Sequence, residues 1–151
     1  MNESLPEELK EALGRAQEPA MELVTRRDIR KYAIATGQRE ARYLEGSEAP
    51  PRFHATLLRP LGSLEDIGPE GSLPDPLLGS LPFEVIGSGR TNTQYFQPIR
   101  CGDYLVIQRK LTGARPAANA SPHRWVCETT WIVESDYGAP VVIETTEHFL
   151  R

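Results

Sequence analysis

Three histidines and their acidic neighbours are the residues of this chain best suited to acid–base chemistry. His54 lies near a candidate helix, with Glu40 and Glu48 upstream as possible carboxylate partners. An imidazole that titrates near neutral pH can take or give a proton, and a nearby carboxylate can orient it. No carboxylate lies at a diagnostic spacing from His54. A packed or surface histidine is therefore the favoured interpretation, and a catalytic His54 is the alternative.

The other two histidines have less chemical context. His123 lies in a short loop after Pro122, and we expect it to be solvated. His148 shares a strand face with Glu144 and Thr146, because side chains two apart in a strand point the same way. That pattern predicts an ordinary sheet residue.

Basic side chains gather in the first third of the chain, although the whole protein is mildly acidic. They are Arg26, Arg27, Arg30, Lys31, Arg39 and Arg42. Such groups bind phosphate, so the cluster is a candidate contact for a phosphate-bearing ligand. A solvated helix face or an interface with an acidic partner explains the same residues equally well, and both interpretations stay open.

The composition excludes several classes of function. The 151 residues fit one domain, and the formal net charge of −4 argues against general nucleic-acid binding, which needs excess Lys and Arg. No apolar run reaches the ~18 residues of a membrane span, and the acidic N-terminus does not resemble a secretory signal. Cys101 and Cys127 have neither metal-ligand nor disulfide spacing, so we expect reduced thiols in a cytoplasmic protein.

The first part of the chain predicts short helices. Residues 5–16 carry apolar side chains at helical spacing, and a brief extended piece follows at 21–24. Thr25 is a candidate N-cap for a helix over 26–36, which should end at Gly37.

The middle of the chain predicts little regular structure. A loop precedes residues 53–58, which can form about two helical turns. Residues 60–82 are so rich in proline and glycine that no long helix can cross them. Such a stretch is either a tolerated surface loop or the mark of a central helix cut short, which would leave a cleft under the sheet.

From residue 83 onward the apolar period changes to two, which predicts an antiparallel sheet. The predicted strands are 83–86, 92–96, 104–111, 124–134 and 141–150, with a hairpin turn at 135–138. Arg109 is the exception on an otherwise apolar strand face. Trp125 and Trp131 share one face of a strand and indicate packing against a covering layer, which the helical first half can supply.

Four segments carry a family resemblance. They are VTRRDIRKYAIATG (24–37), APPRF (49–53), YFQPIRCGDYL (95–105) and the final hairpin at 131–147. Together they resemble MaoC-like hydratases, above all the N-terminal MaoC dehydratase-like domain, over roughly residues 22–148. The third segment is similar to the family's phe/tyr–x–pro–hydrophobic–x–x–gly–asp–x–leu turn and is the most specific of the four.

The resemblance implies an α+β chain with a single hotdog fold, in which an antiparallel sheet wraps a central helix, here a shortened one. We expect an N-terminal helical extension over 1–20 and a hotdog domain over 21–151. The family's chemistry is that of (R)-specific enoyl-thioester hydratases or β-hydroxyacyl dehydratases. A carboxylate and an imidazole flank the reacting water, and a backbone N–H holds the thioester oxygen.

The sequence departs from the family at the catalytic motif. Active members continue after the glycine with Asp-x-Asn-Pro-x-His, whereas here Gln38 stands in place of the aspartate and Tyr43 in place of the histidine. An amide cannot act as a base, and a tyrosine ordinarily titrates near pH ~10. The resemblance therefore supports the fold and the thioester context better than autonomous catalysis.

The sequence thus predicts a non-catalytic hotdog subunit of a heteromeric enoyl-CoA hydratase. Its partner would be a second MaoC-like chain that carries the dyad, in a heterodimer or a dimer of heterodimers. The chain would form part of the pocket for an acyl-CoA or acyl-carrier thioester, with room for a bulky acyl group such as a ring system. Candidate substrate-binding residues are Arg52, Phe53, His54, Tyr95 and Phe96.

Two other functions remain open at this level. One is an autonomous hydratase or thioesterase with unorthodox residues, His54 being the best candidate. The other is a homodimer that binds acyl-CoA without turnover. We expect no metal and no cofactor.

Overall fold

The computed structural model describes residues 5–59, 61–118 and 124–151. Its helices are α1 (Glu7–Ala12), α2 (Arg26–Ala35) and α3 (Ala41–Leu44), with two 3-10 helices, η1 (Phe53–Thr56) and η2 (Leu64–Asp66). Its strands are β1 (Ala20–Leu23), β2 (Val85–Tyr95), β3 (Tyr104–Pro116), β4 (Trp125–Ser135) and β5 (Pro140–Leu150). Within these ranges, no helix has the length and apolar content needed to cross a lipid bilayer.

All five strands form one antiparallel sheet in the order β1-β3-β4-β5-β2. The predicted antiparallel sheet is therefore confirmed. β4 and β5 are joined by the predicted tight turn, in which the Gly138 N–H donates to the Ser135 carbonyl over 2.9 Å. Gly138 has φ +85°, a conformation that favours glycine. β2, which comes before β3 in the chain, pairs with β5 and forms one edge of the sheet, and β1 forms the other edge.

The prediction of two separate strand pieces around Gly87 and Gly89 is wrong. Residues Val85–Tyr95 form the single strand β2, and its pairing with β5 shifts register between Val85 and Gly87 and again between Ser88 and Thr91. The glycines are absorbed as bulges, which bend a strand without ending it.

Both helices predicted in the first part of the chain are present, and the first of them is shorter than predicted. α2 begins as predicted, since the Thr25 hydroxyl accepts a hydrogen bond from the Asp28 N–H over 3.1 Å, and Gly37 follows it at φ +69°. α1 spans six residues instead of twelve, because the chain turns extended at Leu13. The short helix α3 was not predicted.

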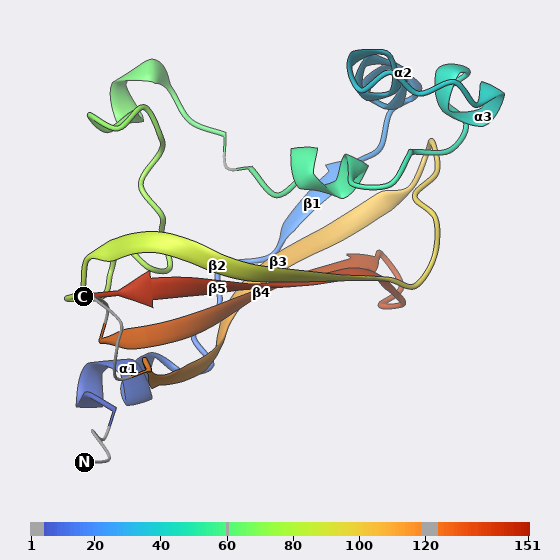
Figure 1. The fold of residues 1–151 in the computed structure, drawn as a ribbon. Coiled ribbons are helices and arrows are strands. Elements are labelled where there is room, and N and C mark those ends of the chain that lie inside the picture. The colour runs from blue at the N-terminus through green and yellow to red at the C-terminus, as the bar shows by residue number, and fades with distance from the viewer. Residues whose placement is uncertain (1–4, 60, 119–123) are drawn as a thin grey trace.

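The position of the expected central helix holds only a single 3-10 turn, η1, where two helical turns were predicted. Arg52, directly before it, has φ +69°, a strained value for a residue with a side chain. In the described residues between η1 and β2 the only further helix is η2. Figure 1 shows α2, α3, η1 and η2 on one side of the sheet, which we call its inner face.

Two apolar clusters pack against the sheet, and each combines strand residues with residues from the helices or loops. One contains Val24, Ile29, Ala49, Phe53, Leu58, Ile99, Leu105, Ile107, Val133, Val141 and Val142. The other contains Leu9, Ala12, Leu77, Leu78, Leu81, Leu111, Trp125, Cys127 and Leu150. Trp125 belongs to the second cluster and Trp131 packs against the first, so both tryptophans are packing residues as predicted.

Candidate functional site

A buried histidine–carboxylate pair lies where η1 meets the inner face of the sheet. His54 is 1% exposed, and its Nε2 lies 2.8 Å from Oε2 of Glu144 on β5. The Thr93 hydroxyl on β2 donates to the same carboxylate oxygen over 2.7 Å. The Tyr95 ring stands edge-on to the imidazole, with 5.5 Å between the ring centroids. The structure thus joins residues of three separate elements around His54.

The ionisation state of Glu144 decides which ring nitrogen of His54 donates to it. Burial alone would raise the pKa of Glu144, but the hydrogen bonds from His54 and Thr93 and the charges of His54 and Arg52 lower it, and the net shift is downward. Ionised Glu144 can only accept, so the proton of a neutral His54 belongs on Nε2. Nδ1 is buried and has no partner among the described residues.

His54 lines a cavity of about 260 Å³, which we call the His54 cavity; Glu144 is not among the residues that line it. Four of the five predicted substrate-binding residues line it, namely Arg52, Phe53, His54 and Tyr95. Phe96 does not line it and is half exposed to solvent. The remaining wall is mostly apolar and includes Pro50, Pro51, Pro98, Ile99 and Val142.

The carboxylate partners suggested for His54 from the sequence are wrong. Glu40 and Glu48 form ion pairs with Arg42 at 2.8 and 3.2 Å. The partner is Glu144, 90 residues away in sequence. Only the fold brings these two residues together, because Glu144 lies on β5 and His54 on η1.

Gln38 and Tyr43, which replace the family's aspartate and histidine, have different surroundings. Tyr43 is buried and lines the His54 cavity, with the Arg42 guanidinium 4.7 Å from its ring centroid. Gln38 is half-buried, and its amide donates to the Thr36 hydroxyl over 3.4 Å.

Half of the basic cluster has a structural role. Arg26 and Arg30 donate to the carbonyls of Glu45 and Leu44 at the end of α3, over 2.9 and 3.2 Å. Arg42 pairs with its acidic neighbours. The phosphate interpretation therefore stays open only for Arg27, Lys31 and Arg39.

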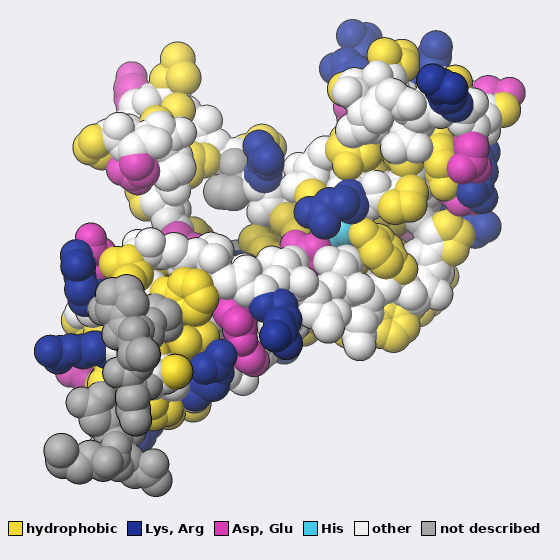
Figure 2. Space-filling view, viewed as in Figure 1, with side chains coloured by type: hydrophobic (Ala, Val, Ile, Leu, Met, Phe, Trp, Pro, Cys, Tyr) yellow, Lys and Arg dark blue, Asp and Glu magenta, His cyan; other side chains and the backbone are white. Residues whose placement is uncertain are grey.

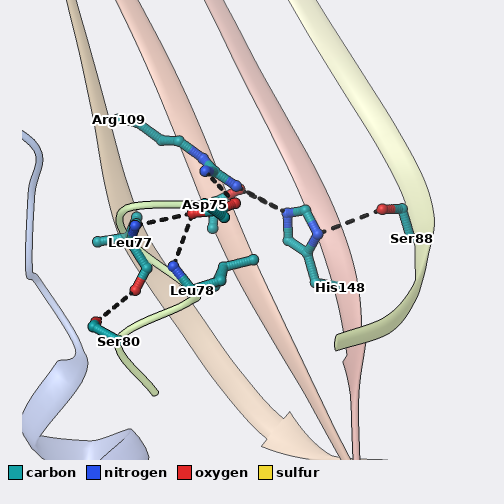
Figure 3. Close-up of polar contacts among 8 residues, drawn as sticks. Asp75, Leu77, Leu78, Ser80, Ser88, Arg109 and His148 are labelled. Atoms are coloured by element: carbon teal, nitrogen blue, oxygen red, sulfur yellow. Dashed lines mark hydrogen bonds and ion pairs between the residues drawn. The ribbon is translucent and has the colours of Figure 1, made fainter. Parts of the chain in front are cut away.

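A second polar cluster lies further along the inner face (Figure 3). Arg109 of β3 donates through Nη1 to Asp75 over 2.7 Å and through Nη2 to the Thr129 hydroxyl over 3.2 Å. Thr129 in turn contacts Nε2 of His148 at 2.9 Å, and Ser88 contacts its Nδ1 at 3.5 Å. His148 lies on β5 as predicted, but within this hydrogen-bonded chain.

The charges in this second cluster balance internally. Burial, followed by the charge of Arg109, lowers the pKa of His148 and keeps the ring neutral. Burial raises the pKa of Asp75, but backbone N–H donors and Arg109 outweigh burial and lower it overall. Asp75 also accepts from the N–H groups of Leu77 and Leu78, both at 2.9 Å, which holds its loop in place.

The space around these clusters is partly open. Figure 2 shows the molecule hollowed between two projecting parts, which Figure 1 identifies as α2 with α3 and the segment around η2. Within the described ranges, no group of three or more His, Cys, Asp or Glu side chains could hold a metal ion.

Comparison with known proteins identifies the fold. The sequence profile described as "FAS1-like, dehydratase domain region" matches residues 11–143. The ChsH1-ChsH2 complex from Mycobacterium tuberculosis aligns with a TM-score of 0.71 at 13% identity, covering 95% of this chain and 88% of the other. No match was found among curated protein sequences.

Two further structures support the same assignment. The HadBC (3R-hydroxyacyl-ACP dehydratase) complex from the same organism has a TM-score of 0.58 at 14% identity, covering 93% and 97% of the two chains. R-hydratase PhaJ1 from Pseudomonas aeruginosa has a TM-score of 0.57 at 16% identity, and the alignment covers 91% of this chain and 80% of the other. These likenesses confirm the α+β hotdog fold and the resemblance to MaoC-like dehydratases.

Proposed function

The chain belongs to the family of FAS1-like dehydratase domain regions, and from that premise we propose that it is a non-catalytic hotdog subunit of a heteromeric enoyl-CoA hydratase. The observation that carries the proposal is the chemistry at positions 38 and 43. Gln38 carries an amide, which has no proton to exchange near neutral pH, and Tyr43 is packed under the Arg42 guanidinium, so the carboxylate and imidazole of the family dyad are both missing at these positions. This subunit would supply a wall of the acyl pocket.

Two exposed features of the chain support pairing with a partner chain: an edge strand of the sheet and a pair of exposed leucines. β2 is an edge strand of eleven residues, and a long exposed edge is a ready site for pairing with another strand. Leu61 and Leu64 on the projecting η2 segment are 93% and 87% exposed, which is unusual for such side chains on an isolated protein. The related HadBC and ChsH1-ChsH2 structures are complexes of two chains, as their names state. We propose a partner hotdog chain that carries the Asp/His dyad.

The expected substrate is an acyl-CoA or acyl-carrier thioester. The single turn of η1 leaves room between the cover and the inner face, where cavities of about 260 and 370 Å³ lie. An acyl group bulkier than a linear chain fits this arrangement.

The test is an activity measurement on the chain alone and with its partner. The purified chain should not hydrate trans-2-enoyl-CoAs, followed by the loss of the enoyl-thioester absorbance. A complex with a second hotdog chain that carries Asp-x-Asn-Pro-x-His should do so. Robust hydration by the chain alone would refute the non-catalytic role.

A second candidate is an autonomous hydratase or thioesterase, and the His54–Glu144 pair favours it. Glu144 orients the ring of His54, which lines the His54 cavity, as a carboxylate orients the imidazole of a general base. His54→Leu separates the two functions. It should lower the turnover of the two-chain complex by no more than about tenfold if His54 only lines the acyl pocket. It should lower turnover at least a hundredfold if His54 is the base.

A further inference from the structure

The segment around η2 (residues 61–73) exposes large apolar side chains although its own turn is fixed by hydrogen bonds. Leu61 and Leu64 are 93% and 87% exposed. The N–H and the hydroxyl of Ser63 both donate to the Asp66 carboxylate over 3.0 Å, which closes the η2 turn. Figure 1 shows this segment projecting away from the sheet. Leucines held in place on a projection, with nothing to pack on, indicate a contact surface for another chain.

The charges of the η2 segment determine what kind of surface can cover these leucines. Its charged residues are all acidic and exposed, namely Glu65, Asp66 and Glu70. The next basic residue along the chain is Arg90. An acidic surface would bring like charges together on docking, whereas a basic one would be attracted. The surface that fits the η2 segment is therefore apolar and basic.

The chain itself carries a surface of this kind on α2. Arg27, Lys31 and Ile34 follow one another at helical spacing and so share one face of the helix. All three are exposed, Ile34 to 65%. Neither Arg27 nor Lys31 has a hydrogen bond or ion pair with another residue that the structure describes. Arg39, just beyond the helix, adds a third cation. These are the basic residues for which the sequence also allowed an acidic partner.

The two surfaces lie apart in one molecule but can meet between two copies. Figures 1 and 2 show the η2 segment and α2 projecting on the same side of the sheet, with a hollow between them. A two-fold rotation brings the η2 segment of each copy to α2 of the other. Such an arrangement has two identical contacts and closes on itself.

We propose that the η2 segment of one copy of this chain docks on α2 of a second copy. The leucines would pack against the Ile34 side of the helix, and Glu65 and Glu70 would face Arg27 and Lys31. The inference goes beyond the proposed function. The edge of β2 stays available for the chain that carries the dyad, so this contact would join two such pairs into a dimer of heterodimers.

Two charge reversals test the proposal on the full chain. Arg27→Glu with Lys31→Glu gives a variant in which both surfaces are acidic, and Glu65→Lys with Glu70→Lys gives one in which both are basic. The unmodified chain should dimerise in sedimentation velocity runs. Each variant alone should show a dissociation constant raised by about tenfold or more, because attraction becomes repulsion at both contacts. An equimolar mixture of the two variants should dimerise again, because each acidic surface then faces a basic one.

Two further variants serve as controls. Glu8→Lys with Glu11→Lys makes the same change of net charge on α1, which Figure 1 shows apart from both projections, and should leave dimerisation unchanged. Leu64→Ser keeps every charge but removes apolar contact area, so it should also raise the dissociation constant by about tenfold or more. Because Leu64 is so exposed, the circular dichroism of this variant should match that of the unmodified chain.

The remaining outcomes overturn the inference. An unmodified chain that stays monomeric would refute it. A dimer that is indifferent to both reversals would place the contact on another surface, such as the edge of β2. Variants that fail to dimerise when mixed would show that the η2 segment and α2 do not face each other. The proposed function would stand in all three cases, since the hydration assay with the dyad-bearing chain tests it separately.

Discussion

The inner face of the sheet carries two buried polar clusters, one built around a histidine and the other around an arginine, each with an acidic partner. At the first, Glu144 holds His54 through Nε2, and the buried Nδ1 has no partner among the described residues. At the second, Asp75 and Thr129 hold Arg109 through its Nη atoms, and the buried Nε has no partner among the described residues. Each cluster contains one residue of β5: Glu144 belongs to the first and His148 to the second, and their side chains lie on the same face of the strand.

The clusters also differ in what covers them. His54 belongs to η1, a turn packed into an apolar cluster through Phe53. Asp75 belongs to an irregular segment whose position depends on its own hydrogen bonds to Leu77 and Leu78. The comparison predicts that the second cluster depends more on its ion pair than the first does.

The largest expected effect is that of Arg109→Met. The substitution leaves Asp75 without its cation and removes the donor to Thr129, so the free energy of unfolding should fall by about 3 kcal/mol. Urea denaturation at neutral pH measures it. Adding Asp75→Asn should recover more than half of the loss, because no unpaired charge then remains.

The control for this prediction is a surface pair on the same strand. Arg115 of β3 pairs with Glu147 at 2.9 Å, and its side chain is half exposed. Arg115→Met should cost less than about 1 kcal/mol, because solvent screens such pairs. An equal loss in the two variants would mean that the Arg109 pair is no more important than a surface pair.

A smaller effect is expected for His54→Leu. The leucine fills a similar apolar space but leaves Glu144 with Thr93 as its remaining donor, so unfolding should become easier by about 2 kcal/mol. His54→Gln retains an N–H that can reach the carboxylate and should lose less than half as much. If both variants lose the same amount, the hydrogen bond to Glu144 is not what stabilises this cluster.

The acid dependence of stability should separate the two variants further. The folded-state pKa of Glu144 lies below its ordinary value of 4.5, so this group contributes stability above about pH 4.5 and loses it as the pH falls through the folded pKa. His54→Leu removes a main cause of that lowering. The difference in unfolding free energy between the unmodified chain and His54→Leu should therefore shrink between pH 5 and 3, in urea titrations at about half-unit steps. A constant difference would contradict the role assigned to this pair.

The sequence predicts those features of the structure that depend on residues close together in the chain. The Thr25 cap and the period-two strands involve neighbours in the chain, and the structure confirms both. The His54–Glu144 pair joins residues 90 apart, so no spacing rule could find it. Arg109 stood out as the charged exception on an apolar strand face, but its partner Asp75 lies in a segment that could be read only as irregular. Tertiary packing, and not local preference, assembles both clusters.

The smallest expected effect concerns the two thiols, which lie against the two apolar clusters. Burial raises the pKa of Cys127 to about 11, so near pH 8 only about one thiol in a thousand is ionised. Cys101 is half-buried at the edge of the other cluster and is easier to reach. With iodoacetamide near pH 8, Cys101 should be alkylated first, and in concentrated urea both should react alike, as mass spectrometry can follow. Equal rates without urea would mean that the cluster around Cys127 opens far more readily than its packing indicates.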